Sequence, residues 1–191
     1  MIAIYHQNYF YNIVVWLNEG LDFFYIMLWY WKKDSGILKN MKLENKDYMF
    51  VGLQGLLFVA YLLNVNLFQI NISKVIYIIG ICIAITGALV ALIALSQLNT
   101  NLSPFPSPKS NISLITNGIY KYSRHPIYTG ILGILLGYGL YAGSGYKIFI
   151  TIMLLVLFYY KSKYEEKKLS SMFSKYPEYM KTTGMFLPKA L

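Results

Sequence analysis

Two long apolar stretches constrain this chain more than any other feature. Residues 48–70 and residues 75–98 each exceed twenty residues, and at about 1.5 Å per residue each can cross a hydrocarbon core of roughly 30 Å as a helix. Only residues 71–74 separate them, so the sequence predicts an antiparallel hairpin with a tight turn. The second stretch repeats small residues at a spacing typical of close helix packing, namely Gly80, Ala84, Gly87, Ala88, Ala91 and Ala94.

A second apolar pair follows later in the chain. Residues 127–142 and residues 146–160 are apolar, and the sequence Gly-Ser-Gly at 143–145 predicts a turn between them. The predicted fold class is therefore all-α, a polytopic membrane helical bundle with four core transmembrane helices in two hairpins. We expect three segments, which are an N-terminal aromatic segment at 1–47, a transmembrane hairpin at 48–98, and a cofactor-binding core with the second hairpin and a cytosolic C-terminal segment at 99–191.

The N-terminal segment has two interpretations. Residues 9–31 are strongly aromatic, yet Glu19 and Asp22 lie in their middle, where a carboxylate is costly in hydrocarbon. An additional membrane span and a helix lying at the membrane interface both fit this pattern. A change in composition near Met41 also allows that residue to be the native start.

Composition and charge support a membrane protein. Apolar residues make up 57% of the chain and charged residues only 13%, whereas charged residues are about a quarter of an ordinary soluble domain. Fifteen of the seventeen basic residues fall in segments 32–47, 99–125 and 161–191. By the positive-inside rule, these segments and the C-terminus face the cytoplasm. The net charge of +9 comes with no groove-reading motif, so we expect no nucleic-acid partner.

The residues that bind metals best are scarce. Cys82 is the only cysteine and sits inside an apolar stretch, and the two histidines, His6 and His125, are far apart in sequence. The chain therefore has no pair of cysteines for an internal disulfide and no thiolate or histidine cluster for zinc or iron. We expect no metal site.

The segment GIYKYSRHPIYTG, residues 118–130, stands out against this background. It contains Arg124, the single arginine, directly before His125, and it runs into the apolar residues 127–142. It follows the sequence SPFPSP at 103–108, which is incompatible with a helix interior and predicts an extended loop. Pro126 suits the first turn of a helix.

The second hairpin predicts which residues meet this segment. Arg124 lies twenty residues before Ser144, the centre of the turn, and Tyr164 lies twenty residues after it. Antiparallel helices therefore return Glu165 and Glu166 to the membrane depth of Arg124. The alternative is that the two glutamates belong to a solvated helix surface. Tyrosines at the same depth form either a pocket wall or an interfacial belt, and these are Tyr120, Tyr122, Tyr128, Tyr160 and Tyr164.

These motifs resemble a known superfamily. The block LITNGIYKYSRHPIYTG at 114–130, the pair Glu165 and Glu166, and the ending GMFLP at 184–188 are similar to the isoprenylcysteine carboxyl methyltransferase and phospholipid methyltransferase superfamily, in particular to bacterial-type members. The resemblance implies an enzyme that binds S-adenosylmethionine at the cytosolic face, in a bacterial-type inner membrane. It implies catalytic roles for Arg124 and Glu166. It also implies cofactor contacts for Tyr120, His125, Pro126, Tyr128, Gly130 and Glu165.

The expected function is an integral-membrane methyltransferase acting on an amphiphilic, lipid-soluble acceptor through a carboxyl, amine or hydroxyl group. The C-terminal segment has only lysines, such as Lys181, where the prenylcysteine enzymes have a further arginine. Two alternatives remain open at this stage. One is a membrane reductase of the steroid-reductase type that uses NADPH, and the other is a lipid-binding or transport subunit, for which Asn64 and Asn66 are the available polar groups. The oligomeric state is left open.

Overall fold

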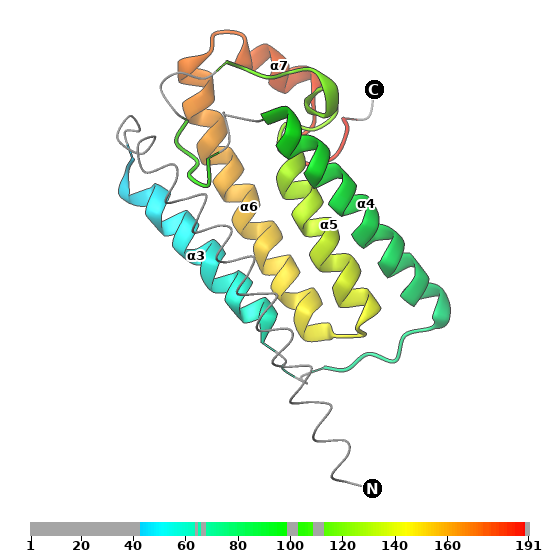
Figure 1. Cartoon of the computed structure of the whole chain (residues 1–191). Coiled ribbons are helices and arrows are strands. Elements are labelled where there is room, and N and C mark those ends of the chain that lie inside the picture. The colour runs from blue at the N-terminus through cyan, green and yellow to red at the C-terminus, as the bar shows by residue number, and fades with distance from the viewer. Residues whose placement is uncertain (1–42, 64, 66–67, 99–102, 109–112, 190–191) are drawn as a thin grey trace, which may run out of the picture. The chain divides into compact units, whose positions relative to one another are not determined.

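The computed structural model describes residues 43–63, 65, 68–98, 103–108 and 113–189, and helices form the regular structure of these ranges (Figure 1). The predicted all-α fold class is confirmed. The predictions for residues 9–31, Met41, Asn64 and Asn66 fall outside the described residues. The helices are α3 (Asn45–Leu62), α4 (Lys74–Leu98), the 3-10 helix η2 (Gly118–Lys121), α5 (Pro126–Tyr141), α6 (Gly145–Met172) and α7 (Tyr176–Thr182).

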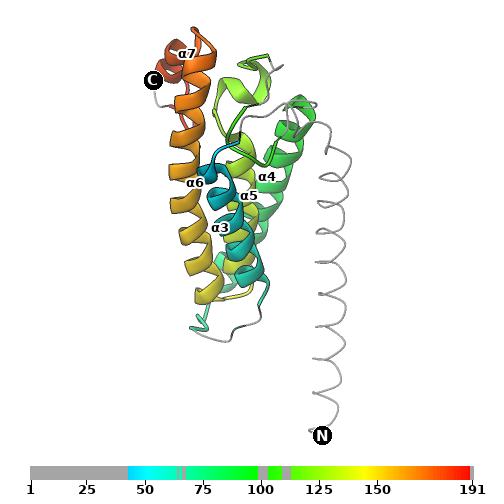
Figure 2. The same ribbon diagram turned by 90° about the vertical axis from the view of Figure 1, so that its left-hand side faces the viewer.

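Four helices lie along one another, with α5 between α4 and α6 (Figures 1 and 2). In the described part of the chain, α4 packs against α5, and α3 packs against α6. The predicted hairpin of residues 48–70 and 75–98 is therefore wrong in its packing partners. Its tight turn is also wrong, because α3 already ends at Leu62 and α4 begins at Lys74.

The reason lies in the connection between α3 and α4. The amide of Ile70 donates a hydrogen bond of 2.8 Å to the carbonyl of Gly143, and the amide of Gly145 donates one of 2.8 Å to the carbonyl of Phe68. These bonds hold the connection across the turn between α5 and α6. The chain thus crosses the turn between α5 and α6 before α4 starts. As a result, α4 packs on α5 rather than on α3.

Glycines bring α4 and α5 into close contact. A Cβ atom on Gly87 would lie 2.7 Å from the carbonyl oxygen of Gly130, and one on Gly137 would lie 2.5 Å from that of Gly80. Only hydrogen atoms fit in these spaces, so the two backbones approach as closely as small residues in membrane helices permit. The prediction that the small residues of 75–98 serve helix packing is confirmed by this contact.

A small apolar core joins α3 to the second hairpin. Tyr61 of α3 packs with three buried residues of α6, which are Ile150, Leu154 and Phe158. The Tyr61 hydroxyl donates a hydrogen bond of 2.6 Å to the backbone carbonyl of Leu135 on α5. This bond links α3 to α5, and breaking it would leave a buried hydroxyl without a partner, which is costly.

The outer surface of the helices is apolar. Two described helices, α4 and α6, are long and apolar enough to cross a membrane, and α5 is a shorter apolar helix. Large apolar side chains on α4 are exposed, including Val75, Ile78, Ile85, Leu89 and Leu92. A surface of this kind in water would promote aggregation, whereas in a bilayer it faces lipid. The exposed apolar residues therefore agree with a membrane location.

Candidate functional site

The segment before α5 is shaped by three local features. Gly118 begins η2 with a φ of +58°, which favours glycine, and the Gln97 side chain of α4 accepts a hydrogen bond of 3.0 Å from the Ile119 amide. Pro126 occupies the first turn of α5. Because the residue before a proline is held out of the helical region, His125 and Arg124 lie just outside α5 and face the C-terminal half of α6.

α6 supplies the carboxylates. It runs without a break from Gly145 to Met172, and Gly143, with a φ of +58°, closes the turn that precedes it. Arg124 and His125 therefore meet Glu165 and Glu166, as the hairpin geometry predicts.

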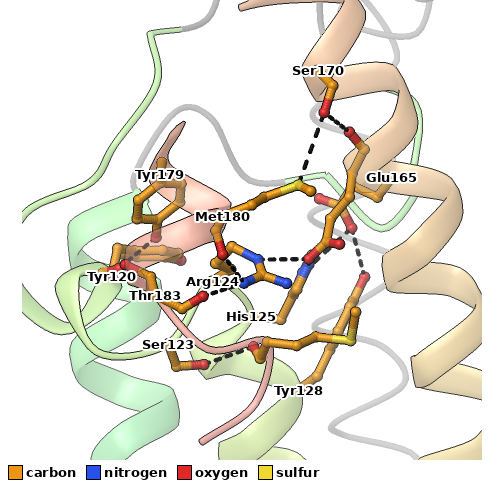
Figure 3. Close-up of polar contacts among 12 residues, drawn as sticks. Tyr120, Ser123, Arg124, His125, Tyr128, Glu165, Ser170, Tyr179, Met180 and Thr183 are labelled. Atoms are coloured by element: carbon orange, nitrogen blue, oxygen red, sulfur yellow. Dashed lines mark hydrogen bonds and ion pairs between the residues drawn. The ribbon is translucent and has the colours of Figure 1, made fainter. Parts of the chain in front are cut away.

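Arg124 and Glu166 form a buried ion pair. Arg124 Nε donates a hydrogen bond of 2.8 Å to Glu166 Oε1, and the two side chains are only 9% and 4% exposed. Arg124 Nη1 also donates to the backbone carbonyls of Met180, at 3.3 Å, and Thr183. Figure 3 shows the guanidinium between α6 and the segment that contains Met180 and Thr183. The charge of Arg124 is thus balanced inside the protein.

His125 lies between the two carboxylates. Its Nε2 is 3.2 Å from Glu166 Oε1, and its Nδ1 is 3.8 Å from Glu165 Oε2. The imidazole stacks on the ring of Tyr128 with a centroid distance of 5.6 Å and an angle of 3°. Tyr128 donates a hydrogen bond of 3.4 Å to Glu165 Oε2 and stacks in turn on Phe158 of the core. Packing therefore fixes the orientation of both rings.

A pocket opens beside these residues. Its walls come from Leu98 at the end of α4, the loop 103–108, residues 113–115, Tyr120, residues 124–128, and side chains of α6 and α7. Glu165 lines this pocket, and its side chain is 27% exposed. Glu166 is not among the described residues of the wall. The two neighbouring glutamates therefore have different surroundings, one open to a ligand and one enclosed.

Tyrosines of α7 complete the wall. Tyr176 is 2% exposed, and Tyr179 donates a hydrogen bond to the backbone carbonyl of Tyr120. Burial raises the pKa of Tyr179 to about 12, mainly because the phenolate would lose its hydration. The hydroxyl therefore keeps its proton at neutral pH and remains a donor.

The loop 103–108 is held by residues that the sequence did not single out. Asp47 of α3 is fully buried and accepts hydrogen bonds of 3.0 Å and 2.7 Å from the amide and hydroxyl of Ser107. Lys161 of α6 donates bonds of 2.9 Å to the Pro104 carbonyl and 2.6 Å to Gln54. The sequence signal for these anchors was the charge of Asp47 at the start of an apolar run and of Lys161 at the end of another.

The remaining predicted residues divide into three groups. Tyr120, Pro126 and Tyr128 line the pocket together with His125, Arg124 and Glu165. Gly130 instead lies in the contact between α4 and α5, where an added Cβ would meet the Gly87 carbonyl at 2.6 Å. Tyr122 and Tyr160 are exposed, and Tyr164 donates a hydrogen bond of 2.9 Å to Glu44.

Comparison with known families bears on this arrangement. The sequence model of the phospholipid methyltransferase family matches residues 75–176, slightly more than half of the chain. The chain belongs to the phospholipid methyltransferase family. Within it, the family match spans α4, α5 and α6, and so includes Arg124, His125 and both glutamates. α3 and residues 177–189 lie outside the matched region.

A solved structure shows the same fold. The eukaryotic intramembrane Ras methyltransferase ICMT (isoprenylcysteine carboxyl methyltransferase) matches with a TM-score of 0.57 and 22% identity, over 76% of this chain and 53% of that chain. This member of the phospholipid methyltransferase family therefore spans about half the length of the solved structure. A search of curated protein sequences found no match.

Proposed function

We propose that the protein is an integral-membrane methyltransferase that uses S-adenosylmethionine and acts on an amphiphilic acceptor. The observation that carries this proposal is the meeting of His125, Tyr128 and Glu165 in one pocket at the end of apolar helices. Membership of the phospholipid methyltransferase family supports the reaction type.

The pocket residues fit the cofactor in their chemistry. When bound, S-adenosylmethionine supplies a methyl group on a positively charged sulfonium. Glu165 offers a carboxylate to the positive charges of such a ligand, and the rings of Tyr120, Tyr128 and Tyr176 offer faces for cations or an adenine. Leu98, Leu114 and Ile127 make part of the remaining wall apolar.

We assign ligand contacts to Tyr120, His125, Pro126, Tyr128 and Glu165, which line the pocket. Methyl transfer depends chiefly on aligning donor and acceptor, so rigid walls contribute to the rate. An amine or hydroxyl acceptor also loses a proton, and Glu165 is the open carboxylate that takes it. A carboxylate acceptor needs no proton acceptor.

The pocket's place at the end of the helix bundle supports an amphiphilic acceptor. α4 exposes apolar side chains along its length, while the pocket end carries the polar site. A lipid-soluble acceptor reaches such a site from the bilayer, and a water-soluble cofactor reaches it from the aqueous side.

We further propose that α3, α4, α5 and α6 form four spans in a bacterial-type inner membrane, with the site in the cytoplasm. α5 has 16 residues, which gives about 24 Å of helix, short of the full hydrocarbon thickness but close to it. Among the described residues, the basic side chains of Lys46, Lys121, Arg124 and residues 161–189 belong to the segments around the pocket end, which supports the cytoplasmic side.

The proposal is tested with membranes from cells that express the protein. They are incubated with S-adenosylmethionine labelled in its methyl group, and lipid extracts are examined by mass spectrometry. The expected result is a labelled lipid-soluble species that control membranes lack. Label that never exceeds the control would contradict the proposal.

A further inference from the structure

We infer that Arg124 and Glu166 are positioning residues, which together hold the C-terminal residues 180–186 against the start of α5, and that Glu165 alone of the two glutamates meets the ligand. Only the second half of this inference, that Glu165 meets the ligand, rests on the proposed function. It departs from the catalytic roles that the sequence resemblance implies for Arg124 and Glu166.

The first support comes from the hydrogen bonds of the Arg124 guanidinium. Arg124 directs Nε to Glu166 on α6 and Nη1 to two backbone carbonyls, those of Met180 and Thr183. One side chain therefore connects the start of α5, the end of α6 and the C-terminal segment. Arg124 is among the residues that line the pocket, but only 9% of its side chain is exposed.

The second support is the backbone pairing beside it. The amides of Arg124 and His125 donate hydrogen bonds of 2.9 Å and 3.0 Å to the carbonyls of Gly184 and Met185. Ser123 and Gly184 form a parallel bridge. These amides precede the first turn of α5 and have no partner within that helix, so the C-terminal segment supplies the partners.

Side chains extend the same attachment. The Ser123 hydroxyl donates a hydrogen bond of 3.0 Å to the Met185 carbonyl, and the Thr129 hydroxyl donates one of 2.7 Å to the Phe186 carbonyl. The Thr183 hydroxyl donates a hydrogen bond of 3.2 Å to the Lys121 carbonyl. The attachment thus runs from residue 121 to residue 129, and Arg124, near its centre, makes these contacts with a charged side chain.

The attachment sets the pocket wall. The last residues of α7 belong to the held segment, and the same helix supplies Tyr176 and Tyr179 to the wall. If the segment detaches, these tyrosines lose their fixed place. Arg124 lies in the pocket wall, but its Nε and Nη1 are bound within the protein, so its effect on the ligand comes chiefly from holding α7 in place.

The two glutamates are separated by their position on the helix. Successive residues of an α-helix point about 100° apart, so Glu165 and Glu166 face different neighbours. Glu166 Oε1 is shared by Arg124 Nε and His125 Nε2, at 2.8 Å and 3.2 Å. Glu165 faces the pocket and receives the Tyr128 hydroxyl.

The test measures amide hydrogen exchange at residues 124 and 125, whose amides bind the C-terminal segment, in the purified full chain. The variants are Arg124→Ala and the shape-preserving Glu166→Gln. Lys121→Ala is the matched control, because it removes an exposed cation three positions away. We expect at least about tenfold faster exchange in Arg124→Ala, a smaller increase in Glu166→Gln, and none in the control.

Binding of S-adenosylhomocysteine and the kinetic constants complete the test. A displaced wall weakens ligand binding, so Arg124→Ala should bind about tenfold more weakly, equivalent to about 1.4 kcal/mol, and Glu166→Gln should show a smaller loss. Both variants should raise KM for the cofactor more than they lower kcat. Unchanged exchange with lost turnover would overturn the inference, because Arg124 would then act on the reacting groups directly. Faster exchange with unchanged binding would overturn the link to the pocket. Failure of the wild type to bind would refute the proposed function, while exchange would still decide the attachment.

Discussion

Arg124 Nε lies 2.8 Å from Glu166 Oε1, although the two residues are 42 positions apart in the chain. This ion pair joins the start of α5 to the last turns of α6, and both side chains are almost fully enclosed. The pair therefore belongs to the framework that holds the site together.

Replacing Glu166 by alanine should destabilise the protein. The change leaves the Arg124 guanidinium buried without its carboxylate, which costs about 3–5 kcal/mol in comparable buried pairs. Unfolding by denaturant in detergent measures the effect, and Glu178→Ala, at an exposed position on α7, provides the control. Wild-type stability in Glu166→Ala would show that the pair contributes nothing to folding.

Replacing Glu165 by glutamine should leave stability nearly unchanged and reduce activity. Glu165 is partly open to the pocket, so its amide analogue keeps the shape of the wall and leaves stability within about 1 kcal/mol. The carboxylate is lost, and methyl transfer should fall by about a hundredfold or more. Transfer of labelled methyl groups into lipid is the measurement. Activity within twofold of wild type would remove Glu165 from the site.

Adding a methyl group at Gly87 should separate α4 from α5. Its Cβ would lie 2.7 Å from backbone atoms of α5, which cannot rotate away, so Gly87→Ala should cost about 1–3 kcal/mol. Gly52 of α3 has open space around it, and Gly52→Ala should stabilise the helix by up to about 1 kcal/mol. Thermal unfolding of both variants compares the sites. Equal effects would mean that the close contact is absent.

Replacing Asp47 by alanine should loosen the loop 103–108. Asp47 accepts the Ser107 amide and hydroxyl in a fully buried place, and an orphaned buried donor costs about 1–3 kcal/mol. Hydrogen exchange at the Ser107 amide reports the change directly and should accelerate. If that exchange stays at the wild-type rate, α3 does not position this wall of the pocket.

Equal spacing on either side of the turn was enough to predict that Arg124 and His125 meet Glu165 and Glu166. The rise per residue is the same in both helices, so equal distances from the turn at Ser144 return to equal depth. The same reasoning could not choose between the glutamates, because it predicts depth but not which side of α6 faces α5.

Packing partners were harder to predict. Apolar stretches next to each other in sequence suggested that α3 packs on α4, but hydrogen bonds from residues 68–70 carry the connection over the second hairpin. The anchors Asp47 and Lys161 were missed for a related reason. Their partners, Ser107 and Gln54, are 60 and 107 positions away, beyond any local pattern.

Calorimetric titration of the purified protein with S-adenosylhomocysteine and with NADPH tests the central claim most directly. S-Adenosylhomocysteine shares the adenosine and amino-acid parts of the methyl donor, so it occupies the proposed pocket without reacting. We predict saturable binding of S-adenosylhomocysteine, weakened in Glu165→Gln, and no binding of NADPH. Binding of NADPH without binding of S-adenosylhomocysteine would contradict the methyltransferase assignment and favour a membrane reductase.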